Sequence, residues 1–427
     1  MYKNTLLLAL TLLVFSTANA QRKLIHCGSL INGKTSEIRN QVTIIVEGNK
    51  IVSVENGFTT PAGNDQVIDL KKKTVMPGLI DMHVHLESET SKDQQVKKFT
   101  QNEADIAFQS TIYAKKTLMA GFTTVRDCGG TGVNTALRNA INQGNVVGPR
   151  VLSAGKGVAT TGGHGDPTNG NRRDLMGDPG PKEGVINSPE EAYKAVRQRY
   201  KDGADFIKIT ATGGVLSVAK DGSGPQFTQE EVNAIVQAAK DYGFHTAAHA
   251  HGAEGMKRAV LAGITTIEHG TLMSEEVMDL MKEKGTYLVA TIIAGRSAAE
   301  FAKIPGYYHP LVVPKALAIG SKIQENFGKA YKRGVPIAFG TDAGVFPHGE
   351  NAKEFGYMVE GGMPAIDALL SAMQVNANII GLGDKIGSVE AGKLADLIAV
   401  NENPASNIKT MMNVTFVMKD GVIYKAE

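Results

Sequence analysis

Two histidines, His83 and His85, stand two residues apart in the stretch VMPGLIDMHVHL at 75–86. They follow an apolar run that ends in Pro77-Gly78. Side chains on a strand alternate between its two faces, so both imidazoles point the same way. Neutral imidazole is a ligand suited to zinc and its neighbours. The pair alone is a weak signal, and it predicts a metal site only if other donors converge on it.

Further residues that could bind metal or move a proton occur in four later apolar segments. Each has an ordinary structural alternative, such as an ion pair for the lysine, a backbone-bonded core side chain for a histidine, or a helix cap for the aspartate. Together these alternatives are a poor explanation, because every candidate falls at the same end of a different predicted strand. The candidates are Lys208 in FIKI, His249 and His251 in AHAHG, His269 in IEHG and Asp342 in GTDAG.

Short apolar strands alternate with helical segments about eight times between residue 75 and about residue 384. This alternation is typical of a parallel sheet covered by helices, and eight units predict an α/β fold of the (β/α)₈ TIM-barrel type. A doubly wound sheet would need a Gly-rich dinucleotide turn after the first strand, and the sequence has none there. The predicted strands are 77–86, 123–128, 150–155, 206–212, 245–251, 265–270, 287–293 and 337–342.

The position of the candidates along these strands fits a catalytic site. In a TIM barrel the active site lies at the C-terminal ends of the strands, which is where the histidines, the lysine and the aspartate fall. The two ends of the mature chain have a different, β-rich texture. We expect the segments 21–76 and 385–427 to build one small β-sandwich domain beside a barrel at 77–384.

Charge and cysteine content restrict the partners. The net charge of the 427 residues is +2, from 45 basic and 43 acidic side chains. Such a balance gives no reason to expect nucleic acid or an anionic membrane surface as a partner. Cys27 and Cys128 are the only cysteines, and we expect two buried free thiols in preference to a disulfide.

The first twenty residues have the pattern of a cleavable signal peptide. Lys3 is followed by an apolar stretch at 6–15 and by Ala18-Asn19-Ala20, a small-x-small cleavage pattern. The apolar stretch is short for a membrane span, although an uncleaved anchor is the alternative. We therefore expect a periplasmic or secreted protein that starts at Gln21.

Taken together, the motifs MPGLIDMHVHL, FIKI, AHAHG, IEHG, GTDAG and VEAGKLADLIAV resemble the metal-dependent amidohydrolase superfamily. They are most similar to its imidazolonepropionase-related branch of Xaa-Pro dipeptidases and C-terminal exopeptidases. The resemblance covers essentially the whole mature chain. It implies two divalent metal ions, with Zn²⁺ the expected identity.

The resemblance also implies a role for each candidate. His83 and His85 would bind the more buried ion, and His249 and His269 the second. Lys208 resembles the lysine that reacts with CO₂ to give a carbamate bridging both ions. Asp342 would bind the first ion and carry the proton.

The chemistry is consistent with these roles. A carbamate turns a repelled ammonium into an anionic oxygen donor, and lysine suits this reaction because its pKa falls readily on desolvation. Two Zn²⁺-like ions generate a hydroxide nucleophile near neutral pH and polarise a carbonyl. Asp342 would then deliver the proton to the leaving nitrogen.

Several other residues are candidates for contact with the substrate. The segment 156–187 is too long for a plain connection and is expected to cover the barrel mouth. It contains a histidine in a Gly-rich setting, for which an ordinary surface role is the alternative. The substrate-contact candidates are His164 in this segment, His251, Arg296 and the pair Tyr307-Tyr308.

The sequence therefore predicts a secreted binuclear amidohydrolase that cleaves C–N amide bonds of small peptides or N-acyl amino acids. No nucleic acid, and no membrane after signal cleavage, is expected as a partner, and a homo-oligomer is left open. Rival enzyme readings are a mononuclear deaminase, a hydrolase of a cyclic amide or imidazolone ring, and a hydrolase of ochratoxin-type aryl amides. A non-catalytic binding protein is a rival of another class.

Overall fold

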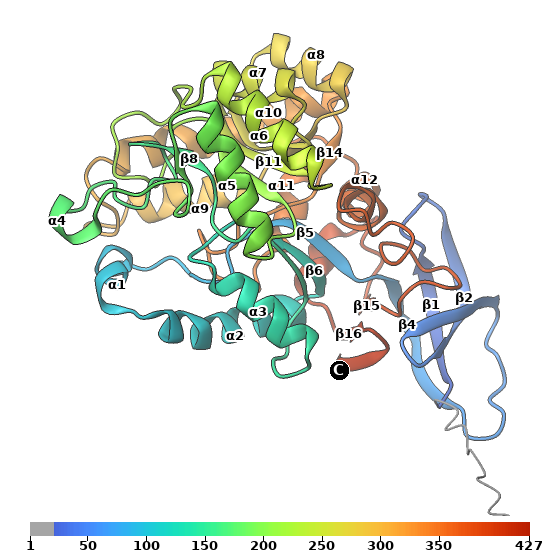
Figure 1. Ribbon diagram of the computed structural model, residues 1–427. Helices are drawn as coiled ribbons and strands as arrows, with labels where there is room; N and C mark the ends of the chain where they lie inside the picture. The colour runs from blue at the N-terminus through green and yellow to red at the C-terminus, as the bar shows by residue number, and fades with distance from the viewer. Residues whose placement is uncertain (1–20) are drawn as a thin grey trace, which may run out of the picture.

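The computed structural model describes residues 21–427, so the predicted signal peptide at 1–20 lies outside the described residues. Within that range, eight parallel strands carry or adjoin the predicted site residues (Figure 1). Three form one sheet: β5 (Leu79–Val84), β6 (Phe122–Asp127) and β7 (Arg150–Ser153). Five form another: β10 (Ile207–Thr210), β11 (Thr246–Gly252), β12 (Thr266–Leu272), β13 (Tyr287–Val289) and β14 (Ile337–Ala338).

Single parallel bridges connect these two sheets at both of their edges. At one edge Val84 pairs with Ala343, and the His85 N–H donates to the Ala343 carbonyl at 2.8 Å. At the other edge Val158 pairs with Ile209. The strands therefore neighbour one another in chain order, and the expected α/β class with parallel strands is confirmed.

Helices follow most of these strands, and their ends are set by local sequence. Ser188, Thr228 and Ser274 each accept a hydrogen bond from a backbone N–H three residues on, as N-caps do. The helices are α1 (Gln94–Thr100), α2 (Glu103–Met119), α3 (Val133–Asn142), α4 (Arg173–Met176), α5 (Pro189–Lys201), α6 (Gln229–Asp241), α7 (Ala253–Ala262), α8 (Glu275–Lys284), α9 (Ile292–Ala302), α10 (Val313–Arg333), α11 (Lys353–Glu360), α12 (Ala365–Leu370) and α13 (Asn376–Ile379), with short turns η1 (Ser371–Val375) and η2 (Ile408–Met412).

The seventh predicted strand, 287–293, is shorter in the structure. β13 ends at Val289, and α9 begins at Ile292. Thr291 turns the chain between them with a φ of 51°, a left-handed backbone conformation. The apolar run continues into the first turn of the helix, and hydrophobicity alone does not separate a buried strand from a buried helix start.

The two ends of the described chain share one seven-stranded sheet (Figure 1). This sheet is mixed and has its own buried core, which includes Ile25, Ile44, Val75 and Phe416. In spatial order the strands are β17 (Val422–Ala426), β16 (Phe416–Lys419), β15 (Leu397–Val400), β4 (Gln66–Pro77), β1 (Lys23–Ile31), β2 (Ile38–Glu47) and β3 (Lys50–Asn56).

Gly78 joins this sheet to the strand that carries the first two histidines. A Cβ atom at this position would lie 2.1 Å from the Thr123 hydroxyl oxygen, so only glycine fits between β4 and β5. A second link is ionic, because Arg150 contacts Asp396 and Asp420 at 2.7 Å each. The terminal sheet thus holds the starts of β5 and β7.

Two further expectations concern the membrane and the thiols. In the part of the chain that the structure describes, no helix is long and apolar enough to cross a membrane. Cys27 and Cys128 are both free and buried, as expected. Burial raises the pKa of each thiol to about 12, which makes the thiolate, the reactive form, scarce.

Candidate metal centre and substrate cavity

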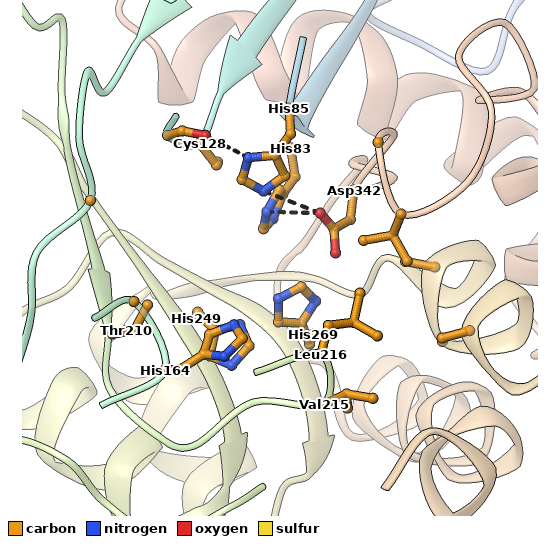
Figure 2. A pocket seen from close by; sticks show the side chains of 18 of the residues that line it. His83, His85, Cys128, His164, Thr210, Val215, Leu216, His249, His269 and Asp342 are labelled. Carbon is orange, nitrogen blue, oxygen red and sulfur yellow. Dashed lines mark hydrogen bonds and ion pairs between the residues drawn. The ribbon is translucent and has the colours of Figure 1, made fainter. Parts of the chain in front are cut away.

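A cavity of about 380 Å³ lies at the C-terminal ends of the parallel strands. All six residues predicted to bind metal line it, and so do two of the predicted substrate contacts. Figure 2 labels five of the predicted metal ligands: His83, His85, His249, His269 and Asp342. The side chains come from strands far apart in the sequence, which meet only through the parallel arrangement. The shared lining residues are His83, His85, Lys208, His249, His269, Asp342, His164 and His251.

The donor atoms of these residues lie close enough to share a metal ion. Candidate ligand atoms of His83, His269 and Asp342 lie within 4.8 Å of one another, and the same holds for His249, His251 and His269. The two groups of three share His269. Imidazole and carboxylate donors suit zinc and similar ions, so the residues present fit a pair of divalent cations. The geometry also admits His251, predicted as a substrate contact, to the second group.

Asp342 and Lys208 lie against the first pair of histidines. The Asp342 Oδ1 atom is 3.5 Å from His83 Nε2 and 3.3 Å from His85 Nε2. Lys208 Nζ is 3.3 Å from His83 Nε2. Burial favours the neutral acid, but the neighbouring His83 and His85 outweigh it and lower the pKa of Asp342. The residue is therefore held as a carboxylate.

Most of the imidazoles have one ring nitrogen engaged outside the cavity. Such a bond fixes the tautomer and the ring orientation and leaves Nε2 available for a metal or substrate. His249 differs, because its Nε2 lies 3.2 Å from the Gly213 carbonyl oxygen, which leaves Nδ1. The Nδ1 contacts of the others are His83 with Glu268 (2.8 Å), His85 with the Gly129 carbonyl (2.7 Å), His251 with the Thr271 hydroxyl (2.8 Å) and His269 with the Thr291 hydroxyl (2.7 Å).

The contact between His83 and Glu268 belongs to a fully buried ion-pair network. Arg126 donates to Glu268 Oε1 at 2.7 Å and to the Met82 carbonyl at 2.7 Å. Burial alone would raise the pKa of Glu268, but the charge of Arg126 and the bond to His83 lower it to about 2. The sequence reasoning missed both residues. The signal was a charged residue inside an apolar strand, Glu268 beside His269 and Arg126 in FTTVRD.

Burial also keeps most of the histidines neutral; His85 differs, because its contact with Asp342 outweighs burial and raises its pKa. Burial lowers the pKa of His83 and of His251 to about 4 and the pKa of His164 to about 3. Neutral imidazole is the form that binds metal. The cavity therefore presents unprotonated nitrogen donors at neutral pH.

The backbone is strained at two of the site residues and at one of their supports. His269, Thr291 and Asp342 have φ values of 73°, 51° and 62°, in the left-handed region that side-chain-bearing residues seldom adopt. Such conformations persist only where the surroundings enforce them, and they gather at functional sites. Here the imidazole of His269 and the carboxylate of Asp342 line the cavity, and the hydroxyl of Thr291 contacts His269.

Glu354 of α11 enforces one of these conformations. Its carboxyl group is buried and accepts hydrogen bonds from the N–H groups of Ile292 (2.9 Å) and Ile293 (2.7 Å), which begin α9. These residues directly follow Thr291, whose hydroxyl contacts His269. Burial raises the pKa of Glu354 to about 8.

The structure places some of the candidates for substrate contact in the cavity and others outside it. His164 stacks on His249 with ring centroids 4.2 Å apart, and its buried Nδ1 has no hydrogen-bond partner among residues 21–427. Arg296 instead contacts Glu360 (3.0 Å) and lies over the Tyr357 ring, on the outer side of α9. Arg296 is not among the residues that line the cavity.

Tyr307 is also outside the cavity lining. Its hydroxyl lies 3.1 Å from the hydroxyl of Thr90, and Thr90 itself lines the cavity. Tyr307 can thus affect the site only through Thr90.

One wall of the cavity is apolar, and the sequence reasoning did not find it. The wall is made by a loop after β10, by two helices and by the segment after Asp342. No motif marks such residues, because their hydrophobicity is indistinguishable from that of core positions. They are Val215, Leu216, Ala294, Ala298, Ile319, Ile323 and Val345.

Comparison with known proteins agrees with the resemblance found in the sequence motifs. The model of the amidohydrolase family matches residues 74–424. The crystal structure of a Xaa-Pro dipeptidase with bound methionine in the active site is 53% identical, with a TM-score of 0.93. The match covers 95% of this chain and 100% of the dipeptidase chain.

Curated relatives point the same way. The ochratoxinase of Aspergillus niger is 32% identical over 97% of this chain and 89% of its own length. The imidazolonepropionase of Caldanaerobacter subterraneus subsp. tengcongensis is 27% identical over 89% of this chain and 87% of its own length. The family and the structural neighbours imply a TIM-barrel α/β fold.

The contact between Glu268 and His83 leads to a first prediction. Glu268→Gln removes the carboxylate that orients His83 and leaves Arg126 buried without its counter-charge. We expect metal affinity to fall roughly 10- to 100-fold, measured by titration of the metal-free protein with Zn²⁺.

Thr271→Val is the matched control, since it removes the Nδ1 partner of His251, which is not among the predicted ligands. It should bind metal within a few-fold of the parent. Equal losses in both variants would make His251 a ligand, and an unchanged Glu268→Gln would contradict the orienting role of Glu268.

The raised pKa of Glu354 leads to a second prediction. Between about pH 5 and about pH 8 the folded protein holds a proton on Glu354 that the unfolded chain has released, so the free energy of unfolding falls as pH rises. The variant Glu354→Gln has no ionisable carboxyl group at this position, so its free energy of unfolding lacks this fall with rising pH. The stability of the variant relative to the parent should therefore increase from about pH 5 to about pH 8, measured by urea denaturation.

Glu360→Gln, on the same helix but exposed, controls for charge removal and should show no such trend. Parallel pH profiles for the parent and Glu354→Gln would contradict the assignment.

Proposed function

The chain belongs to the amidohydrolase family, and its relatives make it a hydrolase that acts on amide bonds; we propose that its substrates are small peptides or N-acyl amino acids. The leaving amine would be an amino acid with a free α-carboxylate. The observation that carries this proposal is the joining, in one cavity of about 380 Å³, of the six polar donors with an apolar wall.

We propose that two divalent ions, with Zn²⁺ the expected identity, occupy this cavity. His83, His85 and Asp342 would hold one ion, and His249 and His269 the other, with Lys208 between them as a carbamate. When bound, the ions would polarise the amide carbonyl and activate water as a nucleophile. The buried position of Lys208, 5% exposed beside neutral imidazoles, supports the conversion of its ammonium into an anionic donor.

The chain's own residues supply the proton transfer and the orientation. Asp342 is a carboxylate that can accept a proton from the attacking water and deliver it to the leaving nitrogen. Glu268 keeps His83 directed at the cavity. His164 and His251 offer ring nitrogens to the polar groups of the substrate.

The size of the cavity and its cover support a small substrate. Segment 156–187 contributes His164 and Gly165 to the lining, and the strands β8 (Ala159–Thr160) and β9 (Val185–Ile186) pair at its base. Folded proteins would not enter a cavity of this volume. A Xaa-Pro dipeptidase among the structural neighbours holds methionine in its active site, a free amino acid of the kind that we propose as a product.

Hydrolysis of an aryl amide is the second candidate. It is favoured by the similarity to an ochratoxinase along 97% of the chain. The apolar wall could receive an aromatic acyl group while the polar end of the cavity performs the same chemistry.

Three further proposals rest on the sequence pattern and on the arrangement of strands. Residues 1–20 would be a signal peptide that directs the protein to the periplasm or out of the cell, supported by the Ala18-Asn19-Ala20 cleavage pattern. The eight parallel strands would form a closed barrel, supported by the bridges at both edges. The terminal sheet would form a separate small sandwich-like domain, supported by its own buried core.

The decisive experiment for the substrate compares a cleaved N-acyl amino acid or dipeptide with the same compound amidated at its C-terminal carboxylate. A site that binds the carboxylate rejects the amide, so kcat/KM should fall at least about tenfold. A change on the acyl side is the control and should have a smaller effect. Equal kcat/KM for acid and amide would contradict the proposal and favour ring-opening substrates.

Removal of the proposed bridging ligand tests the metal arrangement. Lys208→Ala should reduce the bound metal from about two ions per chain to about one and abolish most activity, measured by elemental analysis and turnover. Added short carboxylic acids should partly restore the rate, because they can replace the missing anionic oxygens. Lys201→Ala, at the exposed end of α5, is the control. Full metal content and a normal rate in Lys208→Ala would contradict the binuclear assignment.

A further inference from the structure

One wall of the cavity is carried by a loop that follows β10. Val215 and Leu216 of this loop line the cavity together with Ala298 of α9 and Ile319 of α10. The same side chains belong to one hydrophobic cluster. Figure 2 shows Val215 and Leu216 at the cavity that also holds His269 and Asp342.

The ends of the loop are fixed by its own backbone. Thr212 and Pro225 form an antiparallel bridge, and the Gly213 N–H donates to the Gly224 carbonyl at 3.0 Å. Just before the second of these ends, Asp221 stabilises a turn by accepting hydrogen bonds from the N–H groups of Ser223 and Gly224. The stretch between these fixed points, 214–220, carries the two apolar side chains.

A single ammonium group from α10 holds that stretch. Lys315 Nζ donates to the backbone carbonyls of Gly214 (2.9 Å), Ser217 (2.8 Å) and Ala219 (2.8 Å). A lysine has three N–H donors, and the loop takes all of them. The bonds join the loop to the helix that contributes Ile319, four residues further along, to the opposite side of the same apolar cluster.

The position of the loop also affects the polar part of the cavity. A Cβ atom on Gly214 would lie 2.1 Å from His164 Nδ1, so the loop backbone packs directly on this imidazole. His164 in turn stacks on His249. Lys315 therefore controls both the apolar wall and the packing of a histidine at the polar end.

We propose that Lys315 is a specificity-positioning residue, which holds loop 213–224 in place and so completes an apolar subsite for the side chain of the leaving amino acid. Aliphatic and thioether side chains are the class that this subsite fits. The assignment to the leaving amino acid rests on the proposed function.

The geometry supports the leaving side. Val345 lines the cavity and packs against the same cluster as Val215, and its N–H donates to the Asp342 carbonyl at 3.1 Å. Asp342 is the group that would protonate the leaving nitrogen. An amino acid whose nitrogen lies within reach of Asp342 therefore has its side chain next to the apolar wall.

The test uses Lys315→Met, which keeps the apolar stem and removes the ammonium, with Lys322→Met on the same helix as the matched control because Lys322 is exposed. Hydrogen exchange followed by mass spectrometry should show faster exchange for 213–224 in Lys315→Met only. The ratio of kcat/KM for N-acetyl-L-leucine to that for N-acetylglycine should fall about tenfold or more. The loss should lie mainly in KM, whereas general damage to the site would lower kcat for both substrates.

The variant Lys315→Arg keeps the positive charge and tests whether charge alone is enough to hold the loop. Three carbonyls that converge on one point suit an ammonium better than a planar guanidinium, so this variant should also lose discrimination. Unchanged exchange in 213–224, or an unchanged leucine-to-glycine ratio in Lys315→Met, would overturn the proposal.

Failure of the proposed function would be seen separately. If the metal-loaded parent hydrolyses neither compound, binding of L-leucine and of glycine is measured by calorimetry in the parent and in Lys315→Met. Preferential binding of leucine that is lost in the variant supports the subsite, and equal binding of both amino acids by the parent overturns it.

Discussion

The buried carboxylate of Glu268 is the interaction on which the candidate site depends. The cavity gathers imidazoles, a lysine and an aspartate that are largely buried, and buried charges are costly unless paired. Glu268 faces His83 on one side and Arg126 on the other, while Arg126 also bonds the Met82 carbonyl beside that histidine. These contacts hold the strands β5, β6 and β12 together around the Nδ1 atom of His83. Loss of either charged partner would leave the other buried and unpaired, which typically costs about 3–5 kcal/mol.

The strained backbone at His269, Thr291 and Asp342 extends the same arrangement to the opposite strands. His269 lies within β12, whereas Thr291 and Asp342 follow the ends of β13 and β14. The strain is balanced by specific bonds: Glu354 holds the N–H groups after Thr291, and the Asp342 N–H donates to the His83 carbonyl at 2.6 Å. Burial raises the pKa of Glu354 to about 8, although the hydrogen bonds from the N–H groups of Ile292 and Ile293 favour the carboxylate and oppose this rise.

The polar half of the cavity could be predicted from the sequence, because a strand end with an imidazole or an aspartate is visible in the residue types and their spacing. The parallel α/β arrangement followed from the alternation of strands and helices. Other features could not be predicted. The early end of β13 depends on a single left-handed residue, Thr291, inside a continuous apolar run. Arg296 was a plausible carboxylate contact in sequence, but it lies on the side of α9 that faces Glu360 and Tyr357. An apolar pattern does not predict which face of a helix a given residue occupies with that precision.

The two halves of the cavity are built in physically different ways, and this has a consequence for specificity. The donors sit on strands whose positions are fixed by backbone ladders and by the Arg126–Glu268 pair. The apolar wall sits on α9, α10 and a loop that is tied at its ends and bonded in its middle by Lys315 of α10. Substitutions on the inner faces of these two helices can therefore change the shape of the wall without moving the strands that carry the donors, whereas loop 213–224 also contacts His164 and His249 at the polar end.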